Sequence, residues 1–171
     1  MSPSKDPVEH DPGDASAPVL VSTFCLGDAA YALDTALVEE VVRPRRITRV
    51  PHAPGYVLGI MNLRGKIVTV LDLGQILQLG TTTAAEESRL YIVRDCDGIA
   101  GLLVDCAADV IELDGAAIEP LPSSVRESQS RFFRGMARAS GRLIAILDAA
   151  ELLSAELLSM DPPKASAERR I

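Results

Sequence analysis

The sequence predicts an all-β fold made of two small open barrels. Its apolar runs are short, turn residues such as glycine separate them, and the whole pattern occurs twice. Hydrophobic residues make up 47% of the 171 positions, which suits one domain or two small lobes that share a core. Closing each sheet into a barrel would hide the strand edges that otherwise promote aggregation.

The first elements form a predicted hairpin followed by a short helix. Residues 19–26 and 31–33 are typical of strands, and a Gly-Asp pair between them provides the turn. Asp34 is expected to cap a helix that continues to Glu40, because its carboxylate can accept backbone N–H bonds. Pro44 then ends the helix, because the residue before a proline avoids the α conformation.

The rest of the first half alternates extended segments with turns. Residues 47–50 form a short extended piece, and the apolar pattern over residues 56–63 fits either a strand or a helix. A turn that contains Gly65 precedes a buried strand predicted over residues 67–73. Residues 75–79 fit one helical turn.

A second series of strands follows a polar linker over residues 81–88. Strands are predicted at residues 89–94 and 99–104, on either side of an Asp-Gly turn, and again at residues 110–113. Residues 118–129 are rich in Pro and Ser and lack a clear period.

The chain closes with a hairpin and a helix. Strands are predicted at residues 132–139 and 142–147, with a Ser-Gly turn between them. Asp148 is expected to cap a helix over residues 149–160, where leucines recur at helical spacing.

The two halves of the chain resemble each other. Residues 58–77 align with residues 134–153 at an offset of 76 positions. The identical pairs are Gly59/Gly135, Gly65/Gly141, Leu71/Leu147, Asp72/Asp148 and Leu77/Leu153. At an offset of 71, the first hairpins also match through Gly27/Gly98 and Asp34/Asp105. We therefore expect a duplicated unit whose two copies pack together with a groove between them.

The duplication sets the expected domain boundaries. We expect a domain over residues 18–158 that consists of two intertwined barrel subdomains, divided near residues 81–88. The acidic residues 1–17 and the final residues 159–171 lack periodicity and are predicted to be disordered tails.

Charge and composition exclude several functional classes. With 24 acidic and 17 basic residues the net charge is −7, which argues against general affinity for nucleic acid or anionic membranes. Only 4% of residues are aromatic, so base stacking is not expected. The N-terminus lacks the apolar stretch of a signal peptide, and no apolar run reaches the roughly 18 residues of a membrane span. We expect a cytoplasmic protein.

No catalytic or metal-binding pattern is recognisable. Cys25, Cys96 and Cys106 form no CxxC pair and are expected to be reduced structural thiols. Only two histidines are present, so a zinc site is not expected. Asp72 and Asp148 each follow an apolar strand and precede a helical pattern, which favours helix capping over acid–base chemistry. The sequence therefore predicts no cofactor, no metal and no enzymatic activity.

One stretch of this acidic chain is strongly basic. Its four arginines are Arg43, Arg45, Arg46 and Arg49. Such a segment can steer a charged partner, although a solvated loop explains it equally well. Nucleic-acid binding is the remote alternative, because no recognition helix or stacking aromatic accompanies the run.

A set of short motifs runs through the chain in a fixed order. The first half contains F-x-L-G and Y-A-L-D around the hairpin, then V-E-E-V, P-x-A-P-x-Y-V-x-G and N-L-R-G-x-I-V-x-V-L-D-L. The second half contains VDCAADVIEL, FFRGMA and LDAAELL. Together these motifs resemble the CheW-like coupling proteins of bacterial chemotaxis, over roughly residues 18–158.

The resemblance implies two five-stranded, SH3-like β-barrel subdomains around a shared core, with short helices and a C-terminal helix. It also implies a stand-alone, non-enzymatic adaptor that binds the regulatory domain of a chemotaxis-type histidine kinase and the cytoplasmic tips of chemoreceptors. Such an adaptor would work at receptor arrays on the inner face of the membrane, without inserting into it. A non-flagellar chemosensory pathway, such as twitching, surface sensing or second-messenger control, is the alternative.

By position, the resemblance assigns four residues to receptor binding. Arg64, in the N-L-R-G motif, matches an arginine that supports receptor contact, while Val38 and Glu40 match helix positions that face the receptor groove. Gly59 matches a glycine where a side chain would intrude on packing or contact. The structural alternatives are a salt bridge for Arg64 and close packing for Gly59.

Overall fold

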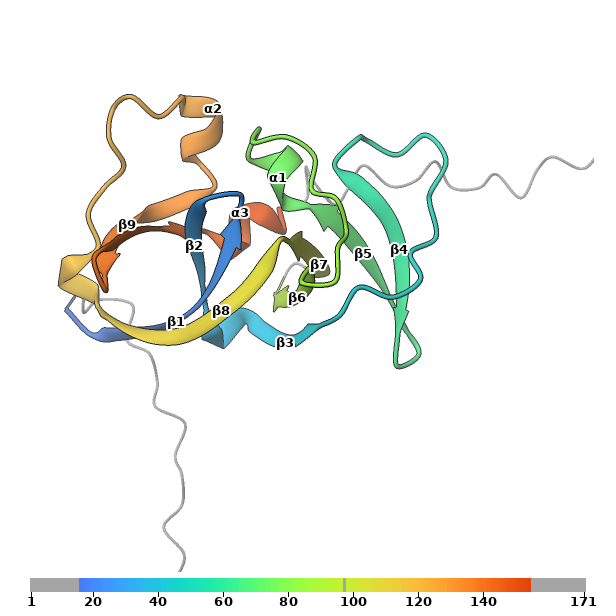
Figure 1. Ribbon diagram of the computed structural model, residues 1–171, viewed down its shortest axis with the longest axis horizontal. Helices are drawn as coiled ribbons and strands as arrows, with labels where there is room; N and C mark the ends of the chain where they lie inside the picture. Colours follow the sequence, from blue (N-terminus) through green and yellow to red (C-terminus); the bar gives the residue numbers. More distant parts are fainter. Residues whose placement is uncertain (1–15, 97, 155–171) are drawn as a thin grey trace, which may run out of the picture.

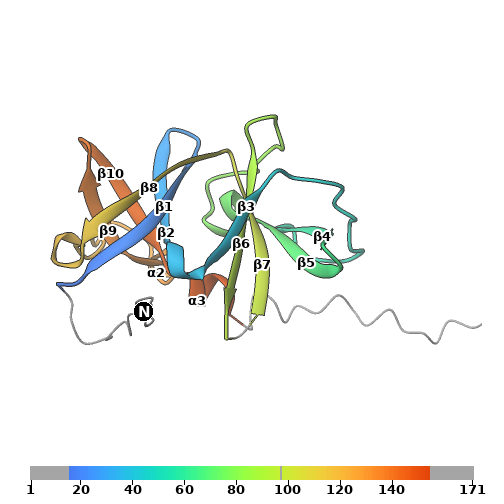
Figure 2. The ribbon, with the colours of Figure 1, turned by 90° about the horizontal axis from the view of Figure 1, so that it is seen from below.

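The computed structural model describes residues 16–96 and 98–154, and these form two five-stranded sheets that lie side by side (Figures 1 and 2). We call the left-hand unit of Figure 1 barrel 1. The spatial order of its strands is β8 (Cys106–Asp114), β1 (Pro18–Leu26), β2 (Ala29–Asp34), β10 (Arg142–Leu147) and β9 (Phe133–Ala139). The predicted all-β fold with two subdomains is confirmed.

Barrel 2 repeats this arrangement. Its strands follow the order β3 (Val38–Val42), β6 (Arg89–Asp95), β7 (Gly98–Val104), β5 (Lys66–Asp72) and β4 (Val57–Leu63). Each sheet contains two antiparallel hairpins: β1–β2 and β9–β10 in barrel 1, and β6–β7 and β4–β5 in barrel 2. The two hairpins of a sheet are joined by a parallel pair of strands, β2 with β10 or β7 with β5. The internal repeat of the sequence therefore corresponds to two sheets with the same pattern of strand pairing.

The two sheets exchange strands between the sequence repeats. Strands β1 to β5 form the first repeat and β6 to β10 the second, but β3 and β5 pair with the β6–β7 hairpin of the second repeat, and β4 joins that sheet through β5. The division near residues 81–88 therefore separates the repeats and not the sheets: the two subdomains are intertwined, as expected, and each sheet takes strands from both sides of that division. Sequence similarity shows which segments are alike, whereas strand pairing depends on which segments meet in space.

Two isolated backbone bridges close the barrels. The N–H and carbonyl of Thr48 pair with those of Ile60 across 2.8 Å, which brings the chain after β3 against β4 at the opposite edge of the sheet. Glu119 and Met136 make the same pair of 2.8 Å bonds in barrel 1. Each bridge thus covers one point of an otherwise open sheet edge.

The helical segments are short. They are the 3₁₀ helices η1 (Thr35–Leu37) and η2 (Gly115–Ala117) and the α-helices α1 (Leu73–Ile76), α2 (Glu127–Ser130) and α3 (Ala149–Leu152). Asp34, Asp72 and Asp148 cap η1, α1 and α3 through their carboxylates, as predicted. The helix expected over residues 149–160 is shorter than predicted, because α3 ends at Leu152 and Leu153 is its C-cap. Residues 155–160 lie outside the described residues, as do residues 1–15 and the whole of the second predicted tail.

The helix expected between Asp34 and Glu40 is wrong. Only Thr35–Leu37 is helical, and Val38–Val42 forms strand β3, which pairs with β6. The segment VEEVV contains three valines, whose β-branched side chains favour an extended backbone. Pairing with β6 therefore outweighs the capping signal from Asp34.

The main core lies between the barrels and belongs to both. It combines Phe24 and Tyr31 of barrel 1 with Tyr91 and Leu102 of barrel 2. The Tyr91 hydroxyl donates a 2.9 Å hydrogen bond to the Thr23 carbonyl of β1, so a polar contact also joins the two sheets. Each barrel has its own smaller apolar cluster in addition.

The cysteines differ from the prediction. Cys25 and Cys106 are joined by a disulfide, with Cα atoms 5.3 Å apart, and only Cys96 is free among the described residues. The two partners face each other in the antiparallel pairing of β1 with β8. They are 81 positions apart in the chain, so the strand exchange that brings them together cannot be read from their spacing.

Candidate functional site

Glu40 and Arg64 lie together on the surface of barrel 2, although 24 positions separate them. The Arg64 guanidinium donates to the Glu40 carboxylate, with 3.1 Å between Nη2 and Oε2. Glu40 lies on β3 and Arg64 in the β4–β5 turn, so the pair connects the two edges of one sheet. The Arg64 side chain is 78% exposed, which leaves most of its guanidinium accessible to a partner.

The β4–β5 turn presents Arg64 in a defined conformation. Arg64 and Gly65 have φ angles of 52° and 84°, the left-handed pair typical of a two-residue hairpin turn. The Asn62 side-chain oxygen accepts a 2.9 Å hydrogen bond from the Gly65 amide and stabilises the turn. The N-L-R-G motif is thus a hairpin turn whose arginine projects from the end of the barrel.

Gly59 is buried inside β4, so it cannot contact a partner directly. Its φ is 145°, and a Cβ atom at this position would lie 2.1 Å from the Thr48 carbonyl oxygen. Gly135 is the counterpart in barrel 1, where a Cβ would lie 2.5 Å from the Glu119 carbonyl oxygen. Both glycines therefore allow the bridge that closes their barrel, which supports the close-packing interpretation of Gly59.

Val38 stands at the start of β3, on a strand and not on the helix that the sequence analysis expected. It is partly buried and packs against the main core. Two residues further along the same strand, Glu40 is half-buried. The structure thus brings Glu40 and Arg64 into direct contact, whereas Val38 packs toward the core and Gly59 lies against Thr48.

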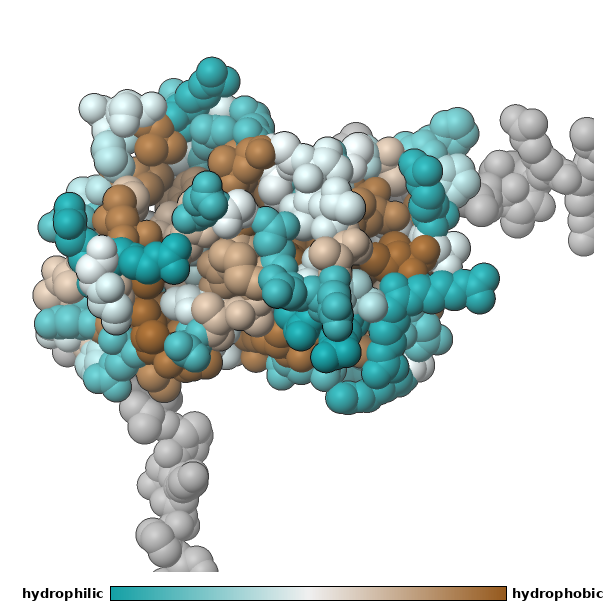
Figure 3. Space-filling model, in the orientation of Figure 1, coloured by the Kyte–Doolittle hydropathy of each residue, from teal (hydrophilic) through white to brown (hydrophobic). Residues whose placement is uncertain are grey.

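The basic run leaves β3 and continues along barrel 2. Its four arginines are exposed, and within the described residues none of them makes an ion pair: Arg43, Arg45, Arg46 and Arg49. Beside them, Arg94 of β6 pairs with Glu39 of β3. Figure 3 shows hydrophilic side chains gathered over the lower right of the molecule, on barrel 2. An acidic partner would meet unpaired positive charge there.

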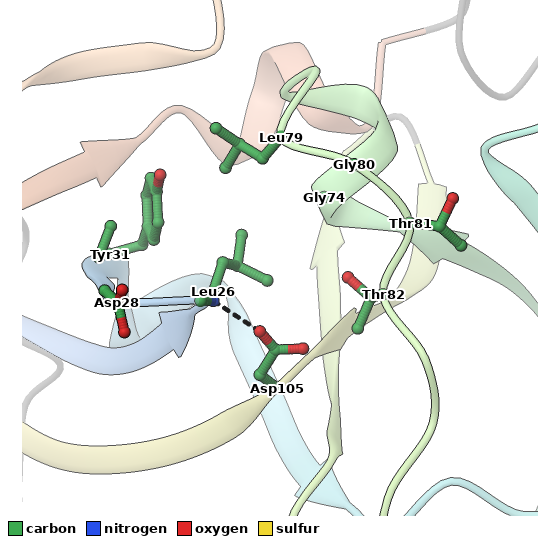
Figure 4. Close-up of a pocket in the computed structure, with 11 residues that line it drawn as sticks. Leu26, Asp28, Tyr31, Gly74, Leu79, Gly80, Thr81, Thr82 and Asp105 are labelled. Atoms are coloured by element: carbon green, nitrogen blue, oxygen red, sulfur yellow. Dashed lines mark hydrogen bonds between the residues drawn. The ribbon is translucent and has the colours of Figure 1, made fainter.

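A cavity of about 500 Å³ lies between the two barrels. One wall is the β1–β2 turn, and the other is α1 with the loop that follows it (Figure 4). Leu26, Tyr31 and Leu79 supply apolar surface, and the Asp105 carboxylate accepts a 2.6 Å hydrogen bond from the Gly27 amide. This cavity lies between the barrels and not between the repeats, because Asp105 is the one lining residue that belongs to the second repeat.

A smaller apolar cavity of about 170 Å³ shares Tyr31 and Leu79 with the first. Leu79 is 55% exposed and borders both cavities. None of the four residues assigned to receptor binding lines either cavity. These lining residues could not be predicted from the sequence, because they come from segments that meet only through the strand exchange.

The described part of the chain contains no group of three or more metal-ligating side chains. In the same residues, no helix has both the length and the apolar character that a membrane crossing needs.

Comparison with known proteins agrees with the architecture. The sequence profile described as a CheW-like domain matches residues 21–157. Chemotaxis protein CheW of Helicobacter pylori is 32% identical over 130 residues, which are 76% of this chain and 78% of the relative. CheW of Bacillus subtilis is 31% identical over 133 residues, covering 78% and 85%. Protein FrzA of Myxococcus xanthus is 28% identical over 123 residues, covering 72% and 76%.

A solved structure matches in three dimensions as well. The crystal structure of the scaffolding protein TtCheW from Thermoanaerobacter tengcongensis superposes with a TM-score of 0.72 and 35% sequence identity. The match covers 84% of this chain and 90% of TtCheW. The two barrels, the turn that carries Arg64 and the sequence relationships lead to one conclusion: the chain belongs to the CheW-like domain family.

Proposed function

We propose that this protein is a non-enzymatic adaptor that couples chemoreceptors to a chemotaxis-type histidine kinase. The observation that carries the proposal is the match to the CheW-like domain over residues 21–157, which spans both barrels. TtCheW, at 35% identity, is described as a scaffolding protein. An adaptor needs two binding surfaces and no reacting groups, and a pair of barrels can offer one surface to each partner.

The receptor-binding surface in this proposal includes the region around Arg64. The guanidinium is exposed, and its ion pair with Glu40 uses one of its terminal nitrogens. The remaining N–H groups can therefore bind a partner carboxylate or carbonyl. The cytoplasmic tip of a chemoreceptor would bind as a helix, with apolar contacts supplying most of the affinity and charges fixing the register.

The kinase would bind through its regulatory domain at another part of the surface. The unpaired arginines of the basic run are available to steer this association, since exposed charge acts mainly on the rate of encounter. Nucleic-acid binding is disfavoured by the net charge of −7.

Isothermal titration calorimetry tests the proposal directly. The full chain is titrated with the regulatory domain of a chemotaxis-type kinase from the same genome, and separately with a cytoplasmic receptor fragment. We expect micromolar or tighter binding to both. Arg64→Ala should weaken receptor binding and leave kinase binding unchanged, whereas Arg138→Ala, an exposed arginine on barrel 1, should affect neither. Absence of binding to every such kinase would refute the adaptor assignment.

A second candidate keeps the adaptor role and changes the pathway. The 28% identity to Protein FrzA is close to the identity shared with several proteins named CheW, so sequence similarity does not favour one pathway. Titration against each chemotaxis-type kinase of the genome separates the two candidates, because the adaptor should bind the kinase of its own pathway more tightly.

A further inference from the structure

The Cys25–Cys106 disulfide lies where the chain passes from one barrel to the other. Strand β7 belongs to barrel 2 and ends at Val104, and β8 belongs to barrel 1 and begins at Cys106. Only Asp105 separates the two strands. The disulfide joins Cys106 to Cys25 near the end of β1, so it fastens the crossover to barrel 1 at its first residue.

The antiparallel β1–β8 pairing, which begins at Cys25 and Cys106, and two hydrogen bonds of Asp105 also hold this crossover. The Asp105 amide donates to the Cys25 carbonyl across 3.1 Å, and the Asp105 carboxylate accepts from the Gly27 amide across 2.6 Å. Leu26, Gly27 and Asp105 also border the 500 Å³ cavity between the barrels. The bond between the two sulfurs is therefore the strongest link at one edge of that cavity.

The disulfide is accessible to small molecules. Both cysteines are half-buried and line a separate cavity of about 240 Å³, together with Asp109 and Arg142. A low-molecular-weight thiol fits a cavity of this volume. Access of this kind distinguishes exchangeable disulfides from those sealed in a core.

The sequence duplication provides an internal comparison. At the offset of 71 that relates the two hairpins, Cys96 occupies the position equivalent to Cys25, and Thr35 occupies the position equivalent to Cys106. Cys96 is exposed and free. A cysteine pair therefore exists at only one of the two related crossovers, and the other copy offers a natural unpaired reference thiol.

From these observations we infer that Cys25 and Cys106 form a reversible thiol–disulfide site that sets how firmly the crossover at Asp105 is held to barrel 1. This inference is independent of the adaptor role. The co-reactant is a dithiol, and the net reaction turns one protein disulfide and one dithiol into two cysteine thiols and one oxidised dithiol.

The exchange proceeds in two displacements. A thiolate of the dithiol attacks one sulfur, the Cys25–Cys106 bond breaks, a mixed disulfide forms, and the released cysteine thiolate takes a proton. The second thiolate of the dithiol then displaces the remaining cysteine, which is also protonated, and the dithiol leaves as a cyclic disulfide. Two electrons and two protons pass to the protein, and the reverse reaction restores the bridge.

A redox titration of the full chain tests the inference. A Cys96→Ser variant removes the exposed thiol and prevents cross-linking between molecules, and the matched control adds Cys25→Ser and Cys106→Ser. Both proteins are equilibrated with mixtures of reduced and oxidised dithiothreitol, alkylated, and weighed by mass spectrometry. Hydrogen exchange and thermal unfolding are measured on the same samples.

We expect Cys96→Ser to change between no labelled thiols and two labelled thiols as the buffer becomes reducing. Closing a loop of this length should raise the midpoint of thermal unfolding by about 5–15 °C in the oxidised state. Amides around Gly27 and Asp105 should exchange several-fold faster after reduction. In the control, the exchange rates and the midpoint of unfolding should be the same in oxidising and reducing buffers. Two free thiols under every oxidising mixture, or identical exchange rates in both states, would overturn the inference.

Discussion

The Arg64 guanidinium and the Glu40 carboxylate form an ion pair that connects the β4–β5 turn to the edge strand β3 of barrel 2. Arg64 projects from the β4–β5 turn with a left-handed backbone, and Glu40 meets it from the middle of β3. An exposed ion pair contributes little to stability, because solvent screens the charges and both side chains lose freedom. The main effect of the ion pair is therefore to fix the direction in which the accessible guanidinium points.

Replacement of Arg64 by Ala should separate binding from stability. We expect the free energy of unfolding to change by less than about 1 kcal/mol, because the side chain is 78% exposed. Receptor binding should weaken about tenfold or more if the guanidinium contacts the receptor. Urea denaturation and calorimetric titration with a receptor fragment measure the two effects.

A charge exchange distinguishes the contact from the ion pair. Glu40→Arg alone should weaken receptor binding, since it places two like charges together. The double variant with Glu40→Arg and Arg64→Glu restores an ion pair but moves the positive charge to β3. Full recovery of binding in the double variant would mean that the ion pair matters and that the location of the guanidinium does not.

Gly59→Ala should act on the fold and not on a partner directly. The added Cβ would lie 2.1 Å from the Thr48 carbonyl oxygen, and φ at this residue is 145°. We expect a loss of about 2–4 kcal/mol in the free energy of unfolding, because the bridge that closes barrel 2 must shift. Gly65→Ala is the control, with φ of 84° and no atom within 4 Å of the new Cβ. Equal losses in both variants would exclude the steric explanation.

The two repeat-related aspartates should differ in their contributions. Asp72 is fully buried and accepts hydrogen bonds from the Gln75 amide, the Gln75 side chain and the Thr82 amide. Asp148 is half-buried and accepts only the two backbone bonds that cap α3.

We therefore expect Asp72→Ala to cost about 2–4 kcal/mol and Asp148→Ala about 1 kcal/mol. Asp72 also holds the loop that carries Leu79 and lines the inter-barrel cavity, so hydrogen exchange in residues 79–82 should rise only in Asp72→Ala. The free energy of unfolding from urea titration gives the difference, and equal costs would contradict it.

Local chemistry predicted much of the fold. The Gly-Asp and Ser-Gly turns, the capping aspartates and most strands lie where their residues indicated, because each depends on neighbours in sequence. The family resemblance singles out Arg64; its motif folds as a self-contained hairpin turn, and its role in receptor binding stays a prediction. The failure at residues 38–42 has a local cause too: the β-branched valines outweighed a cap that extends only three residues.

The exchange of strands between repeats could not be predicted in the same way. Swapping β3, β4 and β5 between two similar partners changes no residue's local preference, since both hairpins offer equivalent edges. The Cys25–Cys106 bond and the cavity beside Tyr31 and Leu79 both depend on this exchange. They could not be predicted because the sequence repeat shows which segments are similar, but not which strands pair with each other.

Tyr91 should report the contact between the barrels. Its hydroxyl donates to the Thr23 carbonyl across 2.9 Å, so Tyr91→Phe should cost about 1 kcal/mol. Burial raises the pKa of the Tyr91 phenol above 10.0, and hydrogen bonds from Ser22 and with the Ala108 backbone offset part of this. The folded state therefore holds this proton more tightly than the unfolded state does.

The pH dependence follows from that sign. The stabilising effect is complete below pH 10, the ordinary pKa of an unfolded tyrosine, and is lost as the pH rises through the higher pKa of the folded state. Urea denaturation between pH 8 and pH 11 should show stability falling above pH 10 less steeply in Tyr91→Phe than in the parent protein. The same urea titration of Tyr31→Phe serves as a comparison, because burial also raises the pKa of the Tyr31 phenol. An unchanged slope in Tyr91→Phe would contradict the assignment.

The basic run should affect association rates more than stability. Its arginines are exposed and, in the residues that the structure describes, make no ion pairs, so replacing all four with Ser should change the free energy of unfolding by less than about 1 kcal/mol. If they steer the kinase, the association rate should fall about tenfold at low salt while dissociation stays nearly constant. At 0.5 M salt the variant and the parent should associate at similar rates, because screening removes the parent's advantage. Stopped-flow measurements against the kinase regulatory domain compare the two proteins. A salt-independent difference would instead indicate direct contacts from these side chains.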